Sequence, residues 1–137
     1  ATQLSNDFLN ELAELRSKYD KSSLIPVFYY SWTAPLMTIG PNAWGNQLLN
    51  VCGAQTLFAD SPVDYPQVAL KDVLTRQPHA LVAASKSSYS ELEVFWRDHR
   101  VFLKAPLIVV DPDVTSRFSL RLINELKVLC KGIKEGA

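Results

Sequence analysis

The chain has 137 residues, 47% of them hydrophobic, which is enough apolar material for the core of one compact domain. Fourteen lysines and arginines balance fourteen aspartates and glutamates, and a neutral chain lacks the basic surface that binds nucleic acid or anionic membranes. The longest apolar runs are far shorter than the roughly 20 residues that cross a bilayer, so we expect no insertion into a membrane either.

The predicted elements alternate between helix and strand along the chain. Apolar side chains at helical spacing predict helices, and short runs of branched and aromatic residues predict buried strands. We expect helices over 5–19, 43–52, 68–77, 88–99 and 116–134. Between them we expect strands over 24–30, 56–58, 79–85 and 106–110. Such alternation is typical of a three-layer α/β fold with a mainly parallel central sheet and helices on both faces.

The first interstrand segment, 31–42, carries Pro35, Gly40 and Pro41, which predict an irregular loop. Asn42 is then the expected N-cap of the following helix, which has Trp44 on its core face. That helix is expected to end at Gly53, because glycine tolerates a left-handed C-terminal conformation.

A ligand site is expected in the loops that follow the strands, because open parallel sheets bind ligands outside the carboxyl ends of their strands. These loops cover 31–42, 60–66, 85–88 and 111–117, and they are mainly aromatic and apolar. Their notable residues are Trp32, Pro35, Leu36, Met37, Tyr65, Asp113 and Arg117. Such a surface suits a large flat molecule.

The aromatic residues divide into two groups by position. Trp44 and Trp96 lie on apolar helical stripes, which indicates packing in the core. Trp32 and Tyr65 lie in proline-bearing loops, where core packing and ligand contact are both open interpretations.

Signals of catalysis are sparse. The five glycines never form a phosphate-binding loop, and no Gly-x-Ser-x-Gly motif is present. His79 and His99 lie apart from the cysteines, so no metal site and no cofactor are expected. Asp111 and Asp113 could act as paired carboxylates, although an N-cap role before 114–117 is favoured. A small α/β enzyme with a loop carboxylate such as Asp113 is the less favoured alternative class.

The two cysteines, Cys52 and Cys130, leave two interpretations open from the residues alone. They are either separate buried thiols or the two halves of a disulfide.

Several motifs together resemble one known family. Residues 40–60 contain the pattern Gly-x₇-Leu-Leu-x₃-Gly, residues 65–68 read Tyr-Pro-Gln-Val, and Asp113-x-x-x-Arg117 follows the last predicted strand. These segments resemble the C-terminal lobe of the helical-backbone substrate-binding proteins that serve ABC importers, and within that group the periplasmic cobalamin (vitamin B12) binders. The glycine and leucine pattern is shared with haem and siderophore binders, whereas the cysteine pair and the Tyr-Pro-Gln-Val segment point to cobalamin.

The resemblance implies a Rossmann-like C-terminal lobe over residues 24–137, preceded in residues 1–21 by the end of the helix that joins two lobes. The N-terminal lobe would then be missing from this chain. It also implies a disulfide between Cys52 and Cys130, a periplasmic location and no enzymatic activity. Haem or a ferric siderophore is the alternative ligand within the same superfamily.

The resemblance further implies where cobalamin would make contact. The ligand contacts of the family fall on Ser31, Met37, Tyr65, Asp113 and Arg117. The first three positions are usually aromatic, and here only Tyr65 is. The neighbouring Trp32 is expected to supply the missing ring.

The resemblance also implies a docking contact with the permease subunits of an ABC importer. A surface glutamate on the helix after Tyr65 normally makes that contact, and its aligned position here is Lys71. Either the adjacent Asp72 takes this role, or the protein docks differently.

Overall fold

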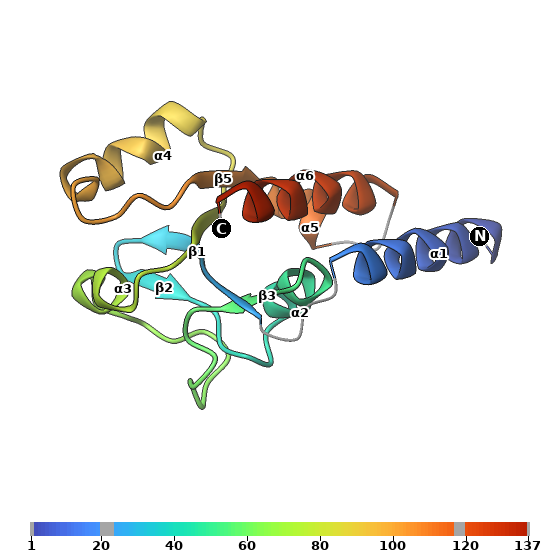
Figure 1. The fold of residues 1–137 in the computed structure, drawn as a ribbon, viewed down its shortest axis with the longest axis horizontal. Coiled ribbons are helices and arrows are strands. Elements are labelled where there is room, and N and C mark those ends of the chain that lie inside the picture. Colours follow the sequence, from blue (N-terminus) through green and yellow to red (C-terminus); the bar gives the residue numbers. More distant parts are fainter. Residues whose placement is uncertain (1, 20–23, 117–119, 137) are drawn as a thin grey trace.

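The computed structural model describes residues 2–19, 24–116 and 120–136, which form a layered α/β fold (Figure 1). Its elements are α1 (Thr2–Lys18), β1 (Ile25–Thr33), β2 (Leu36–Thr38), α2 (Trp44–Val51), β3 (Ala54–Thr56), α3 (Leu70–Arg76), β4 (Ala80–Ala84), α4 (Tyr89–Trp96), the 3₁₀ turn η1 (Arg97–His99), β5 (Leu107–Val110), α5 (Pro112–Thr115) and α6 (Leu120–Gly136). Helices and strands alternate as the sequence predicted.

The sheet is built around β1 and is mostly parallel. Its strand order is β2-β1-β4-β5, and β3 pairs with the first part of β1 on the same side as β2. β1 runs parallel to β3 and β4, and β4 runs parallel to β5, whereas β2 is antiparallel. The parallel strands all present their carboxyl ends at one edge, which fixes where their loops gather.

Helices cover both faces of the sheet, which confirms the predicted three-layer α/β class (Figure 1). Side chains alternate along β1, so that Val27 and Tyr29 face a core shared with α1, α2 and α6. Phe28 and Tyr30 face the second core, which includes Trp96 of α4 and Val73 of α3. Each core buries its apolar side chains between a sheet face and helices, which is the main stabilising contribution in such folds.

Cys52 and Cys130 form a disulfide, as the resemblance to cobalamin binders predicted. Cys52 directly follows α2 and Cys130 lies in α6, and both side chains are almost fully buried. The bond therefore joins two helices on the same face of the sheet across 78 positions of sequence.

The prediction of an irregular loop over 31–42 is wrong for residues 31–38 and holds only for 39–42. β1 continues to Thr33, and residues 36–38 return beside it as β2. Ala34 and Pro35 occupy the turn between them, so the proline that signals a break in the sequence closes a hairpin instead. The β-forming residues on either side of this turn pair across it.

The caps of the helices agree with the sequence in part. Gly53 has a φ of 73°, the left-handed conformation that its position after α2 predicted. Asp111 accepts a hydrogen bond from the Asp113 backbone N–H at 2.9 Å, which confirms its N-cap role for α5. Asn42 is not a cap, because Ala43 occupies that position with no side-chain bond to the helix.

No helix in the described ranges has both the length and the apolar character needed to cross a membrane.

Candidate functional site

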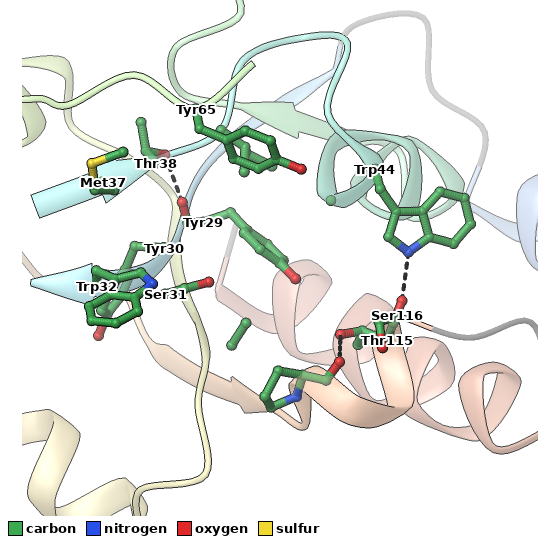
Figure 2. A pocket seen from close by; sticks show the side chains of 14 residues that line it. Tyr29, Tyr30, Ser31, Trp32, Met37, Thr38, Trp44, Tyr65, Thr115 and Ser116 are labelled. Carbon is green, nitrogen blue, oxygen red and sulfur yellow. Dashed lines mark hydrogen bonds between the residues drawn. The ribbon is translucent and has the colours of Figure 1, made fainter.

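A pocket of about 360 Å³ opens at the carboxyl edge of the sheet (Figure 2). It lies where the hairpin of β1 and β2, the loop 60–66, the start of α2 and the short helix α5 meet. Its lining residues are Tyr29, Tyr30, Ser31, Trp32, Met37, Thr38, Ile39, Trp44, Gly45, Tyr65, Ala84, Pro112, Thr115 and Ser116. The site is therefore at the edge that the strand order predicted.

Four of the predicted contact residues meet in this pocket. Ser31 and Trp32 lie at the end of β1, Met37 lies in β2, and Tyr65 reaches the pocket from the loop 60–66. Trp32 is 68% exposed and Tyr65 is 62% exposed, so both rings lie at the rim and not in the core. Two exposed aromatic rings at the mouth of one pocket form a surface that a ligand can stack on.

The backbone of the loop that carries Tyr65 is fastened to β2. The Thr38 N–H donates to the Pro66 carbonyl at 3.0 Å, and the Val68 N–H donates to the Leu36 carbonyl at 3.0 Å. The Gly40 N–H donates to the Asp64 carbonyl at 2.8 Å. These bonds hold the chain on both sides of Tyr65, so the position of its ring follows from the hairpin.

Gly40 is needed for this close approach. A Cβ atom at position 40 would lie 2.1 Å from the carbonyl oxygen of Val63, which is much closer than van der Waals contact allows. Only glycine lets the end of the hairpin and the loop 60–66 pack together in this way.

The floor of the pocket is formed by Tyr29, whose ring lies between Tyr65 and Thr115 in Figure 2. Tyr29 is buried, and burial raises the pKa of its phenol, so the hydroxyl is neutral at physiological pH. The position of Tyr29 in a continuous apolar strand pattern predicted only core packing, and nothing in the sequence marked it as a pocket residue.

Trp44 packs against the first core, as predicted, but it is only half-buried. It also lines the pocket and donates from Nε1 to the Thr115 carbonyl at 2.6 Å (Figure 2). Trp44 therefore joins the start of α2 to α5 across the pocket wall. Trp96 agrees with the prediction, because it is fully buried and donates to the Tyr30 hydroxyl at 2.9 Å.

Asp113 is not among the residues that line the pocket. Its carboxylate lies 2.9 Å from Lys86 Nζ, which also contacts Asp111 at 3.1 Å. The hydrogen bond from Lys86 is the largest cause of a lowered pKa at Asp111. This exposed ion group links the loop after β4 to the start of α5. Arg117, the other predicted polar contact, lies outside the described residues.

The two residues predicted to dock on a permease, Lys71 and Asp72, lie in α3 with exposed side chains. α3 covers the opposite face of the sheet from α1, α2 and α6. Neither residue lines the pocket, so docking and ligand contact would use separate surfaces.

The pocket is uncharged over the part of its lining that the structure describes, where every side chain is apolar, aromatic or a neutral hydroxyl. The described ranges also contain no group of three or more His, Cys, Asp or Glu side chains placed to hold a metal ion. The chemistry available to this pocket is therefore stacking, apolar contact and hydrogen bonding by neutral groups.

Curated proteins similar to this chain include vitamin B12-binding proteins of several bacteria. The vitamin B12-binding protein of Salmonella typhimurium is 35% identical over 136 residues, which cover 98% of this chain and 50% of that protein. The vitamin B12-binding protein of Pectobacterium carotovorum is 32% identical over 133 residues, which cover 95% of this chain and 47% of that protein. No protein-family model matches the chain.

The crystal structure of the periplasmic vitamin B12 binding protein of Vibrio cholerae superposes with a TM-score of 0.80 at 27% identity, covering 96% of this chain and 52% of that one. This chain is similar in sequence and in fold to the vitamin B12-binding proteins. It spans about half the length of the curated relatives it matches. Those relatives are binding proteins by name, in agreement with the prediction that the chain is not an enzyme.

Other solved structures share the fold with much lower sequence identity. The periplasmic haem binding protein of Vibrio cholerae has a TM-score of 0.77 at 11% identity, and it covers 95% of this chain. A possible iron-binding solute-binding protein of Staphylococcus epidermidis has a TM-score of 0.80 at 21% identity. These likenesses concern the fold alone, which confirms the α/β lobe that the sequence predicted.

Proposed function

We propose that this chain is the C-terminal ligand-binding lobe of a periplasmic protein that captures cobalamin and delivers it to an ABC importer. The observation that carries the proposal is the meeting of Ser31, Trp32, Met37 and Tyr65 around one pocket at the carboxyl edge of the sheet. A second lobe, which the half-length match to the relatives calls for, would close over this edge. The cobalamin would be transported unchanged and would not serve as a cofactor.

The composition of the pocket supports a corrinoid over haem. The amide side chains on the rim of a corrin ring are neutral and form hydrogen bonds, whereas haem carries two carboxylates. A pocket whose described lining has no charge suits the neutral rim, because an unpaired buried carboxylate is costly. Trp32 and Tyr65 offer exposed rings for stacking on the face of the macrocycle.

In the same proposal Asp113 lies at the margin of the ligand. It belongs to α5, which contributes Pro112 and Thr115 to the pocket, and its carboxylate pairs with Lys86. Asp113 and Arg117 would make polar contacts to the amides or to the nucleotide tail once the second lobe closes. Permease subunits would contact the surface of α3 around Lys71 and Asp72.

Equilibrium dialysis of this chain against cyanocobalamin and against haemin, each up to millimolar concentration, tests the proposed function. We expect measurable, weak binding of cyanocobalamin and weaker binding of haemin. Equal or stronger binding of haemin would favour the alternative ligand. Recovery of a chemically altered corrinoid would instead indicate an enzyme.

A further inference from the structure

Tyr29 lies deep in the pocket, and the proposed site gives its hydroxyl no role. The side chain is 7% exposed, yet it lines the pocket, and Figure 2 shows its ring directed into the space between Tyr65 and Thr115. A phenol is found at the bottom of a largely apolar pocket when it forms a hydrogen bond there, since an unpaired polar group is costly to bury.

The neighbouring hydroxyl of Thr115 limits how Tyr29 can bond. Thr115 Oγ1 lies within hydrogen-bond distance of the Asp111 carbonyl at 3.1 Å and the Pro112 carbonyl at 3.4 Å, and it has one hydrogen to donate. When that hydrogen is given to either carbonyl, Thr115 offers Tyr29 a lone pair and no hydrogen. A tyrosine O–H turned toward Thr115 leaves the lone pairs of the phenol oxygen facing the open pocket.

The position of the Tyr29 ring is fixed by its surroundings. A Cβ atom at position 45 would lie 3.1 Å from Tyr29 Cε1, so Gly45 lets the backbone of α2 pack directly against the ring. The Trp44 indole binds the Thr115 carbonyl at 2.6 Å and holds α5 on the other side. A hydrogen-bonding atom held in this way can select between ligands, because it cannot move aside for one that leaves it unpaired.

We propose that Tyr29 is a specificity-determining residue whose phenol oxygen accepts a hydrogen bond from an amide N–H on the rim of the ligand. This inference rests on the proposed function and deepens it, since it assigns one contact to the corrin amides. Burial keeps the phenol neutral, as the raised pKa of Tyr29 indicates, so its oxygen remains an acceptor for a neutral amide. The propionate groups of haem have no N–H to donate, so they could pair with this phenol only by accepting its O–H, which would take that hydrogen away from Thr115.

The test compares Tyr29→Phe with Tyr89→Phe in this chain. Both variants keep the ring and remove one phenol hydroxyl, but Tyr89 is 54% exposed on α4 and does not line the pocket. Dissociation constants for cyanocobalamin and haemin are measured by dialysis, and melting temperatures by circular dichroism. We expect Tyr29→Phe to weaken cyanocobalamin binding about 3- to 10-fold, with the melting temperature and haemin binding nearly unchanged, and Tyr89→Phe to have less than about a 2-fold effect.

Three outcomes would overturn the inference. If Tyr29→Phe binds cyanocobalamin as the unmodified chain does, the hydroxyl makes no contact, although the proposed function stands. If it weakens both ligands equally or lowers the melting temperature, the hydroxyl supports the pocket wall and does not select the ligand. If the unmodified chain binds no cyanocobalamin at millimolar concentration, the proposed function fails, and the role of Tyr29 fails with it.

Discussion

At the scale of single residues, the rim of the pocket carries an exposed aromatic ring, that of Tyr65, on a backbone that hydrogen bonds hold in place. Tyr65 is 62% exposed, while backbone hydrogen bonds join the chain on both sides of it to β2 and to Gly40, just after β2. A backbone held in this way loses little conformational entropy when a ligand stacks on the ring, which favours binding. Exposure and attachment together indicate a contact residue and not a core residue.

Replacing Tyr65 by alanine should therefore weaken cobalamin binding and leave the fold intact. The expected loss of binding free energy is about 1 to 3 kcal/mol, the range for an aromatic anchor. The melting temperature should change little because the side chain is mostly exposed. Removal of a core aromatic ring would instead cost about 3 to 5 kcal/mol of stability.

Tyr89→Ala is the matched control for this change. Tyr89 is 54% exposed on α4 and does not line the pocket, so its removal should leave binding unchanged. A Tyr65→Ala variant that loses stability but binds normally in its folded fraction would show that the ring packs and does not contact ligand.

Glu93 and Arg100 form the main charged contact away from the pocket and predict a pH dependence. Arg100 donates to both Glu93 carboxylate oxygens, at 2.6 and 2.9 Å, which lowers the pKa of Glu93. The stability from this pair is complete above the ordinary glutamate pKa, about 4.3, and is lost as the pH falls through the lowered value. Glu93→Gln should therefore show a smaller drop in melting temperature between pH 7 and pH 3 than the unmodified chain. An identical drop in both proteins would mean that the pair contributes nothing measurable.

At the scale of elements, the packing of the hairpin against the loop 60–66 depends on the missing side chain of Gly40. Gly40→Ala places a Cβ 2.1 Å from the Val63 carbonyl oxygen, so the loop must shift. The expected loss is about 1 to 3 kcal/mol of unfolding free energy, measured by urea denaturation. Cobalamin binding should weaken too, because the same loop carries Tyr65.

Gly132→Ala in α6 is the control, because it also replaces a glycine by alanine but lies outside the hairpin and the loop 60–66. Its Cβ would meet Ile108 Cδ1 at 2.8 Å, but that atom is the end of a flexible side chain that can turn away. The gain in helix propensity, about 1 kcal/mol, offsets this contact, so stability should stay within about 1 kcal/mol of the original. A Gly40→Ala variant as stable as Gly132→Ala would show that the loop adapts freely.

The disulfide joins α2 to α6 and should stabilise the lobe through the long segment that it closes. Cys52 and Cys130 are 78 positions apart, and the chain-entropy estimate for a loop of that length is about 4 kcal/mol. Replacing both cysteines by serine should lower the unfolding free energy by about 2 to 5 kcal/mol. Titration of the unfolded, unreduced chain should find no reactive thiol, and two reactive thiols would refute the pairing.

The sequence predicted helices and strands well where a segment shows one clear pattern, either a continuous apolar run or a helical periodicity. The apolar runs of β4 and β5 and the periodic pattern of α6 were recognised from composition and spacing. The hairpin was missed, because Pro35 and Gly40 are read as breaks by local rules. Whether a proline sits inside a turn or ends a strand depends on whether the segments on its two sides pair with each other, as residues 30–33 and 36–38 do here.

The candidate site, too, was predicted only in part, because its residues meet only in the folded chain. Nearby prolines in the sequence mark Trp32, at the end of β1, and Tyr65, in the loop 60–66, as candidate contact residues. Tyr29 and Trp44 have the apolar periodicity of core residues, and only the tertiary arrangement brings them to a pocket. Sequence spacing does not distinguish a side chain at the bottom of a pocket from one in the core beneath it.

At the scale of the whole molecule, the chain spans about half the length of its relatives, and this determines the affinity for cobalamin that we expect. One lobe can cover only about half of a ligand that a closed two-lobed cleft would enclose, while the entropic cost of association remains. This chain should therefore bind cyanocobalamin much more weakly than the full-length vitamin B12-binding protein of Salmonella typhimurium does. Comparison of the two dissociation constants by calorimetry checks this expectation, and equal affinities would contradict it.

The central claim, that cobalamin binds at the carboxyl edge of the sheet, is tested most directly by nuclear magnetic resonance. The backbone and indole N–H signals of the ¹⁵N-labelled chain would be followed during titration with cyanocobalamin to millimolar concentration. The account predicts shifts at the indoles of Trp32 and Trp44 and at the backbone around Tyr65, with no shift at the buried indole of Trp96. Shifts confined to other surfaces, or no shifts at all, would contradict it.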